Sequence, residues 1–439
     1  MNVYFLTLGC KVNQYESEVM LTSLLENGFS QAASQETADV IVLNSCTVTG
    51  TSDQKVRQTL RRARRKNPSA VLVLTGCMTQ AFPDLARQMP EADVILGNTS
   101  RALLLPSIQE FLSTRQPVIQ VEPHRPDAPF EAMRIQGFHE RTRAFIKIED
   151  GCDRYCSYCI IPTARGRVRS KPLPELRREL SDLTAAGYRE VVLVGINLSA
   201  YGKDTGHTLC DAVETACAAE GIARVRLGSL EPDLLTPETL ERLAKEKTLC
   251  PQFHLSLQSG SDDTLRRMNR HYTAAEFLSL AESLRAHFPG CTLTTDVMVG
   301  FPGETDREFE TSLDFVRTVG FEKVHVFAYS RRPGTRAAEM DNQIPRAEKE
   351  RRSKLMIEQT NRMREKFLES LTGKTYPVLF ETVTSGGLAE GYTPHYVPVC
   401  VLGGEDLCGT IRKVTLAAGG ETPGLAIPAG KVFGRLSIL

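Results

Sequence analysis

The chain has 439 residues with 53 basic and 53 acidic side chains, so its formal net charge is zero. This length predicts two or three domains, and no stretch approaches the roughly 18 apolar residues that a membrane-spanning helix needs. The start of the chain lacks a basic region and predicts a strand instead of a signal peptide, so we expect a cytoplasmic protein with no membrane contact. Its twelve cysteines, in that reducing compartment, favour metal or redox chemistry over disulfides.

Short apolar strands alternate with helices in the first part of the chain. The strands are expected at residues 3–8, 40–43, 71–74 and 94–96, and the helices at residues 17–26, 53–66 and 79–87. Such alternation with buried strands predicts an α/β domain built on a doubly wound parallel sheet. We assign residues 1–122 to it.

A cysteine follows each of the first three strands: Cys10, Cys46 and Cys77. Each alone is more simply explained as a small buried residue. The carboxyl ends of parallel strands meet at one edge of a sheet, where open α/β sheets bind their ligands. We therefore expect the three thiols to converge there as ligands of one metal cluster.

A polar, proline-bearing stretch begins at residue 122, and we interpret residues 123–140 as a linker. The strands expected beyond it are at residues 144–148, 191–194, 224–227, 253–257, 291–299 and 323–327. The helices expected there include residues 174–186, 274–286, 306–318 and a long helix at 345–371. Six strand–helix units predict a partial (β/α) barrel over residues 141–371, with its chemistry at the strand carboxyl ends.

Directly after the first strand of this barrel, Cys152, Cys156 and Cys159 form a C-x3-C-x2-C pattern. Three thiolates hold an iron–sulfur cluster but leave one iron without a protein ligand, and an open metal position can bind and activate a substrate. The alternative is a structural zinc site. It needs a fourth ligand, and none stands at a matching spacing.

The last part of the chain, residues 372–439, is rich in valine and glycine. Short strands expected at residues 376–380, 397–401 and 411–416 predict a small β-barrel, an architecture that often binds oligonucleotides.

Two groups of cations also suggest a nucleic-acid partner. The first lies on the helix at residues 57–66: Arg57, Arg61, Arg62, Arg64, Arg65 and Lys66. The second surrounds the cysteine loop: Arg141, Arg143, Arg165, Arg167, Arg169 and Lys171. A charged helix is usually only a solvated face, but few acids interleave here, so we expect an uncompensated field that binds phosphate.

The remaining cysteines show no ligand spacing and are expected to be structural: Cys210, Cys217, Cys250, Cys291, Cys400 and Cys408. Gly195 and Asn197 end one barrel strand, where glycine lets backbone approach a ligand and the amide can pair with it. The alternative for such glycines is a tight strand–helix turn.

With these motifs, the chain resembles the methylthiotransferases of the radical S-adenosylmethionine (SAM) superfamily over essentially its whole length. The resemblance is carried by Leu8-Gly9-Cys10-Lys11-Val12-Asn13-Gln14-Tyr15-Glu16-Ser17, Asn44-Ser45-Cys46-Thr47-Val48-Thr49, Thr75-Gly76-Cys77, the C-x3-C-x2-C loop, Ile161-Pro162-Thr163-Ala164-Arg165-Gly166, Leu257-Gln258-Ser259-Gly260-Ser261 and Val299-Gly300-Phe301-Pro302-Gly303-Glu304-Thr305.

The resemblance implies three domains and two [4Fe–4S] clusters. Cys152, Cys156 and Cys159 are implied to hold the cluster that cleaves SAM to a radical, and Cys10, Cys46 and Cys77 the auxiliary cluster that carries the inserted sulfur. The tail is implied to be a TRAM-like RNA-binding domain. Six residues are expected to contact SAM: Tyr158, Gly195, Asn197, Glu231, Gln258 and Asp296.

Gly9-Cys10-Lys11-Val12-Asn13 is similar to the branch that methylthiolates C2 of N6-threonylcarbamoyladenosine (t6A) beside the anticodon of tRNA. The implied partners are the anticodon loop, an electron donor such as flavodoxin or ferredoxin, and a sulfur source. The alternatives are isopentenyladenosine in tRNA or a ribosomal-protein side chain as substrate. A non-catalytic electron carrier is a further rival, but it would gain nothing from an open iron.

Overall fold

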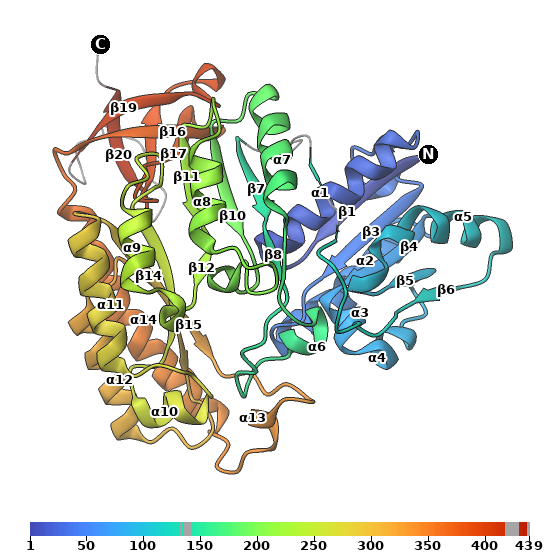
Figure 1. Cartoon of the computed structure of the whole chain (residues 1–439). Coiled ribbons are helices and arrows are strands. Elements are labelled where there is room, and N and C mark those ends of the chain that lie inside the picture. The colour runs from blue at the N-terminus through green and yellow to red at the C-terminus, as the bar shows by residue number, and fades with distance from the viewer. Residues whose placement is uncertain (132–133, 136–141, 418–429, 437–439) are drawn as a thin grey trace.

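The computed structural model describes residues 1–131, 134–135, 142–417 and 430–436, and these form three parts (Figure 1). The first part is a parallel six-stranded sheet in the order β2-β1-β3-β4-β5-β6. Its strands are β1 (Asn2–Thr7), β2 (Ser30–Gln31), β3 (Val40–Ser45), β4 (Val71–Gly76), β5 (Val94–Leu96) and β6 (Val118–Gln120). Its helices are α1 (Lys11–Glu26), α2 (Gly50–Lys66), α3 (Cys77–Ala81), α4 (Pro83–Arg87) and α5 (Leu104–Thr114).

Both faces of this sheet are covered, which confirms the predicted doubly wound domain. Ile41 and Leu43 of β3 pack with α2 in one apolar cluster, whereas Val40 and Val42 pack with α1 and α5 in another. Successive strand side chains point to opposite faces, so two separate cores follow from one strand.

Two helices of this domain differ most from their predicted bounds. The helix expected at residues 79–87 is divided into α3 and α4, because Pro83 lacks a backbone N–H and begins a new helix. The helix expected at residues 17–26 begins at Lys11, directly after Cys10. There the backbone N–H of Cys10 donates to Asn13 Oδ1 at 3.3 Å, and this contact fixes the first turn.

The second part is the predicted partial barrel, made of two parallel sheets ordered β11-β10-β7 and β12-β13-β14-β15. Its strands are β7 (Arg143–Lys147), β10 (Glu190–Val194), β11 (Arg224–Leu227), β12 (Ser229–Leu230), β13 (Gln252–Gln258), β14 (Thr292–Val299) and β15 (Lys323–Ala328). A small antiparallel pair, β8 (Glu149–Asp150) and β9 (Arg169–Ser170), flanks the cysteine loop.

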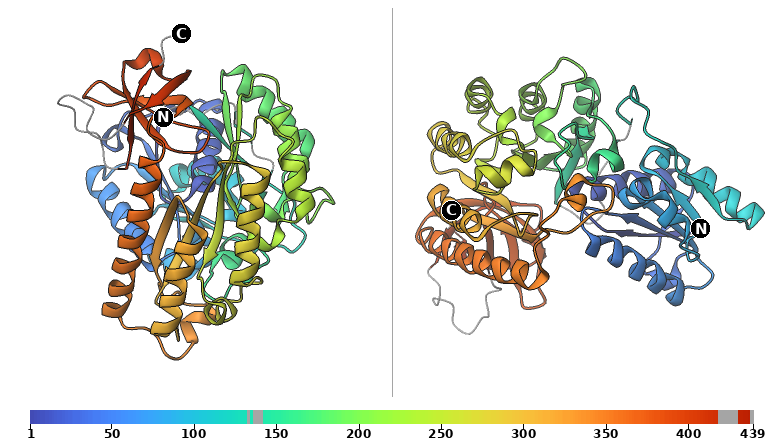
Figure 2. Two further views of the ribbon diagram at one scale, coloured as in Figure 1. Left: turned by 90° about the vertical axis from the view of Figure 1, so that its left-hand side faces the viewer. Right: turned by 90° about the horizontal axis from the view of Figure 1, so that it is seen from below.

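The helices of this part lie mostly on the side of its strands away from the first sheet (Figure 2). They are α6 (Ile161–Arg165), α7 (Leu173–Ala185), α8 (Leu209–Cys217), α9 (Pro237–Leu243), α10 (Asp262–Arg267), α11 (Ala274–His287), α12 (Asp306–Val319), α13 (Arg336–Glu339) and α14 (Arg346–Glu369). The barrel is therefore open toward the N-terminal sheet.

The third part is a closed barrel in the order β16-β17-β18-β20-β19, which confirms the predicted small β-barrel. Its strands are β16 (Thr375–Val383), β17 (Leu388–Tyr392), β18 (Pro398–Leu402), β19 (Ile411–Leu416) and β20 (Val432–Leu436). It packs where the central strands begin: Arg224 donates to the Pro377 carbonyl at 2.8 Å and Arg226 to the Pro394 carbonyl at 2.9 Å. The domain boundaries at residues 122, 140 and 371 stay predictions, and much of the predicted linker lies outside the described residues.

None of the helices in the described part of the chain is long and apolar enough to cross a bilayer.

Candidate functional site

The first cysteine trio lies at the carboxyl edge of the N-terminal sheet. Cys10 precedes α1, Cys46 follows β3, and Cys77 is the first residue of α3 after β4. Burial, and then the neighbouring thiols of Cys77 and Cys10, raise the pKa of Cys46 to about 11. A Cβ added to Gly9, whose φ is +130°, would lie 3.0 Å from the Cβ of Cys46. Glycine therefore allows the Cys10 turn to approach Cys46, and the structure brings the three thiols together.

The second trio lies on the loop between β8 and α6. Burial and the neighbouring Cys156 thiol raise the pKa values of Cys152 and Cys159 to about 12 each. Two polar groups point at the sulfurs: Arg270 Nη1 lies 3.3 Å from Cys156 Sγ, and Asn197 Nδ2 lies 3.8 Å from Cys152 Sγ. The trio thus shares one half-buried loop with N–H donors around it.

Both trios fit iron–sulfur clusters in the chemistry of their donors. Cys77 is buried and four of the other five cysteines are half-buried, and thiolates removed from water are unfavourable without a compensating cation, which bound iron supplies. Hydrogen bonds to cluster sulfurs are an ordinary part of such sites, and guanidinium groups reach Cys77 and Cys156 here. In the described part of the chain, no three His, Cys, Asp or Glu side chains are arranged to hold one metal ion. A four-iron cluster takes each thiolate at a different iron, so its ligands need not meet at a point.

Three of the predicted SAM-contacting residues surround the second trio. Tyr158 is half-buried, edge-on to Phe301 at 6.4 Å between ring centres. Asn197 Oδ1 is buried with no hydrogen-bond partner among the described residues, as expected of a group that faces a ligand. Glu231 accepts two hydrogen bonds from Arg270 Nη2, at 2.9 and 2.7 Å.

The other three predicted residues have different surroundings. A Cβ on Gly195 would lie 2.6 Å from Glu149 Oε2, so glycine is required there by a buried carboxylate. Gln258 has a φ of +66°, an uncommon conformation for a residue with a side chain. Asp296 Oδ2 lies 3.4 Å from His254 Nε2 on the neighbouring strand. No described contact joins Gln258 or Asp296 to the cysteines.

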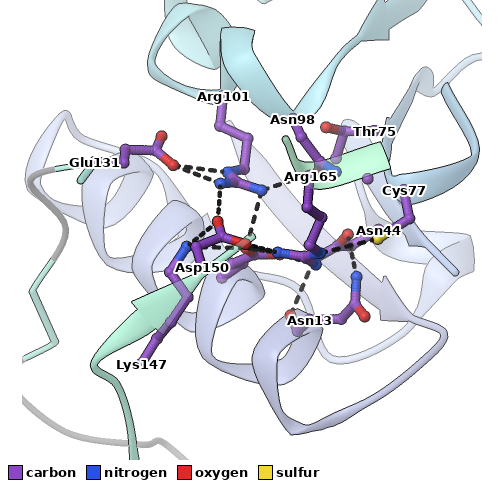
Figure 3. A network of polar contacts seen from close by, with 12 residues as sticks. Asn13, Asn44, Thr75, Cys77, Asn98, Arg101, Glu131, Lys147, Asp150 and Arg165 are labelled. Atoms are coloured by element: carbon purple, nitrogen blue, oxygen red, sulfur yellow. Dashed lines mark hydrogen bonds and ion pairs between the residues drawn. The ribbon is translucent and has the colours of Figure 1, made fainter. Parts of the chain in front are cut away.

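Arg165 connects the two trios across the domain interface. This fully buried side chain on α6 places its Nε 3.3 Å from Cys77 Sγ (Figure 3). Its Nη1 and Nη2 donate to the two carboxylate oxygens of Glu16 at 2.6 and 3.1 Å, and Nη1 also donates to Asp150 at 3.1 Å. Asp150 stands two residues before Cys152, so one guanidinium spans from the first trio to the loop of the second.

Further buried charges complete this network. Glu16 also contacts Arg101 at 3.0 Å and Lys147 at 3.1 Å, and Lys147 lies 3.1 Å from Asp150. Burial alone would raise the pKa of Glu16, but Arg101, Arg165 and Lys147 lower it to about 2. The same kind of neighbours hold the pKa of buried Asp150 well below its usual range. Both carboxylates are therefore ionised and paired with cations from both domains.

Arg270, Glu16, Arg101 and Lys147 were not among the site residues expected from the sequence, although Glu16 lies within a motif of the resembled family. Their roles depend on contacts between residues far apart in the chain: Arg165 and Glu16 are 149 positions apart.

The cations at residues 57–66 of α2 were expected to lack acidic partners. The structure shows that this expectation is only partly correct. Acids outside the helix pair with three of the six cations at residues 57–66, in the ion pairs Arg61–Glu91, Arg64–Asp93 and Lys66–Glu36. Arg57, Arg62 and Arg65 form no ion pair with a described residue. The expectation of an uncompensated field is also wrong for most of the second group, because carboxylates pair with Arg143, Arg165, Arg169 and Lys171. Arg141 lies outside the described residues.

The partial barrel with its three-cysteine loop defines a radical SAM domain. Residues 146–316 match the family model of the Radical SAM superfamily, and residues 2–97 match that of Uncharacterized protein family UPF0004. The radical SAM methyltransferase TsrM from Kitasatospora setae, solved with cobalamin and a [4Fe–4S] cluster, is similar with a TM-score of 0.59. That match covers 77% of this chain and 74% of TsrM at 13% identity, and shows a shared fold.

Curated relatives extend over nearly the whole chain. The threonylcarbamoyladenosine tRNA methylthiotransferase of Thermotoga maritima is 39% identical over 89% of each chain, and that of Bacillus subtilis is 36% identical over 95% of this chain and 94% of the relative. The tRNA-2-methylthio-N(6)-dimethylallyladenosine synthase of Carboxydothermus hydrogenoformans is 34% identical over 95% and 96%. The chain belongs to the radical SAM methylthiotransferase family, whose cofactors are SAM and [4Fe–4S] clusters.

The buried network predicts a large loss of stability in Glu16→Gln, because the change leaves three buried cations without their shared carboxylate. We expect a free energy of unfolding lower by about 3–5 kcal/mol in urea titrations near neutral pH. The pKa of Glu16 is depressed, so its contribution is complete above about 4.5 and is lost as the pH falls toward about 2. The difference between wild type and variant should shrink over that range.

The matched control is Glu365→Gln, since Glu365 is exposed on α14. It should stay within about 0.5 kcal/mol of wild type. A loss below about 1 kcal/mol in Glu16→Gln would show that the network does not hold the domains together.

Proposed function

We propose that the protein transfers a methylthio group to C2 of t6A beside the anticodon of tRNA. The observation that carries this proposal is the approach of two cysteine trios from two domains to one interface, with Arg165 between them. One trio suits an open-iron radical centre, and the other offers a second cluster within reach of the same substrate. The printed names of the 39% and 36% identical relatives support t6A in tRNA as the substrate.

The cysteines would hold the two clusters in separate roles. Cys152, Cys156 and Cys159 would hold the SAM-binding cluster on the barrel. Cys10, Cys46 and Cys77 would hold the auxiliary cluster on the N-terminal sheet. When bound, the clusters and SAM supply the radical that removes hydrogen from C2 and the methylated sulfur that replaces it. Side-chain acid–base chemistry cannot do this, because the C2 hydrogen is not acidic and C2 carries no leaving group.

The chain itself positions these groups. Arg165 and Arg270 donate N–H groups to Cys77 and Cys156 and so orient the sulfurs and stabilise their negative charge. Asn197 and Glu231 lie beside the second trio and would bind polar groups of SAM. Tyr158, Gly195, Gln258 and Asp296 remain proposed SAM contacts.

The RNA would bind across the N-terminal domain and the C-terminal barrel. Arg57, Arg62 and Arg65 of α2, which form no ion pair with a described residue, are available for backbone phosphates. The target base would leave its stack to enter between the domains. An electron donor such as flavodoxin or ferredoxin, a sulfur source and a cytoplasmic location complete the proposal.

Nucleoside analysis of cellular tRNA tests the substrate directly. Cells lacking the protein should lose 2-methylthio-t6A and accumulate t6A, as measured by mass spectrometry of digested tRNA. Re-expression of the gene should restore the product. Unchanged 2-methylthio-t6A would reject the substrate, and loss of 2-methylthio-isopentenyladenosine instead would identify the alternative base.

Loss of a cysteine should affect different reactions in the two trios. After anaerobic reconstitution with SAM and dithionite, Cys46→Ala should still form 5′-deoxyadenosine but transfer no methylthio group, because only the auxiliary site has lost a ligand. Cys156→Ala should form neither product. Cys291→Ala, at a buried cysteine outside both trios, is the control and should retain both reactions. If Cys46→Ala also abolishes 5′-deoxyadenosine formation, the assigned roles are wrong.

A further inference from the structure

Lys11 is a half-buried cation with no acidic partner among the described residues. It follows Cys10 directly, and its Nζ lies 5.9 Å from the centre of the Phe145 ring and 5.8 Å from that of Tyr396. No described carboxylate pairs with it, whereas nearly all other buried cations of the interface contact carboxylates. We call Lys11, Phe145, Tyr396, Arg143 and Arg226 the Lys11 site.

Two other cations, Arg143 and Arg226, lie beside Lys11 in this site. Arg143 and Arg226 both lie over the ring of Tyr396, at 5.2 and 4.8 Å from its centre. These two guanidiniums are already neutralised, Arg143 by Glu381 and Arg226 by Glu190 at 3.0 Å. Burial raises the pKa of Tyr396, but Arg143 and Lys11 lower it below its usual value overall. The site therefore favours a negative group, and no carboxylate of the described residues lies beside Lys11.

Lys11 also contributes little to the stability of the folded protein. It is the first residue of α1, where the helix dipole disfavours a cation, and its side chain is half-buried. A desolvated ammonium without a carboxylate costs stability unless a ligand compensates it. An anionic ligand is the partner that this arrangement lacks.

We propose that Lys11 binds the carboxylate of the threonylcarbamoyl group and thereby selects t6A over adenosines with an uncharged N6 substituent. This inference rests on the proposed function, because it takes the substrate from there. Lys11 adjoins Cys10 of the first trio, so a base with C2 directed to that site can extend its N6 substituent to the ammonium. The rings of Phe145 and Tyr396 exclude water around the contact and strengthen it. A dimethylallyl group has no charge to offer and would leave Lys11 unpaired.

Binding of three anticodon stem-loop RNAs to the reconstituted full-length enzyme tests the proposal. One RNA carries t6A, the second its neutral carboxamide, and the third N6-dimethylallyladenosine. Wild type should bind the t6A RNA roughly 10- to 100-fold more tightly than the carboxamide RNA, as expected for a charge-assisted hydrogen bond. Lys11→Gln should bind these two RNAs with about equal affinity, and Lys11→Arg should keep most of the preference for t6A.

Two further readouts separate a binding role from a structural one. Lys11→Gln should melt at the same temperature as wild type or higher, because it removes an uncompensated buried charge. Lys354→Gln, an exposed lysine on α14, is the control for loss of one positive charge and should keep the full preference for the carboxylate.

Two results would overturn the inference. One is equal binding of the t6A and carboxamide RNAs by the wild type. This result does not depend on the folding of any variant. The other is a Lys11→Gln variant that weakens both RNAs by the same factor, as contact with a backbone phosphate would. Methylthiolation of the same RNAs is measured in parallel. A wild type that prefers the carboxylate but never modifies t6A would reject the proposed function and leave the Lys11 assignment standing.

Discussion

The active site depends on a buried set of charges at the boundary between two domains. Glu16 and Asp150 are ionised there, and Arg165, Arg101 and Lys147 pair with them from both sides of the boundary. Isolated buried charges are costly, so each domain requires the other for its charges to be satisfied. This mutual requirement fixes how the N-terminal sheet meets the open side of the barrel, and with it the relative positions of the two cysteine trios.

The topology then explains why the cysteines are where they are. The carboxyl ends of parallel strands lie at the same edge of a sheet, so Cys10, Cys46 and Cys77 meet there although they are distant in sequence. The loop with the second trio follows a strand end of the barrel in the same way. Arg165 joins the two edges by contacting Cys77 and Asp150. The C-terminal barrel packs at the opposite end of the central strands, away from the cysteine loop.

Periodic patterns and local motif spacings can be recognised in the sequence, whereas contacts between distant residues can be recognised only in the structure. Strand ends and the C-x3-C-x2-C spacing are local, so the architecture and both trios could be predicted. The break between α3 and α4 needed only a stricter interpretation of Pro83. Arg165 pairs with Glu16, and Arg270 with Cys156, through tertiary contacts that no residue spacing in the sequence reveals. For the same reason, the acids that pair with Arg61, Arg64 and Lys66 of α2 were not predicted, since they come from other elements.

Iron content of two triple variants tests most directly whether the two trios hold separate clusters. The reconstituted wild type should contain about 8 iron atoms per chain, as two four-iron clusters require. Replacement of Cys10, Cys46 and Cys77 by alanine should leave about 4, and so should replacement of Cys152, Cys156 and Cys159, each with the electron paramagnetic resonance signal of the one remaining cluster. A triple variant that keeps all of its iron, or one that loses all of it, would contradict this account.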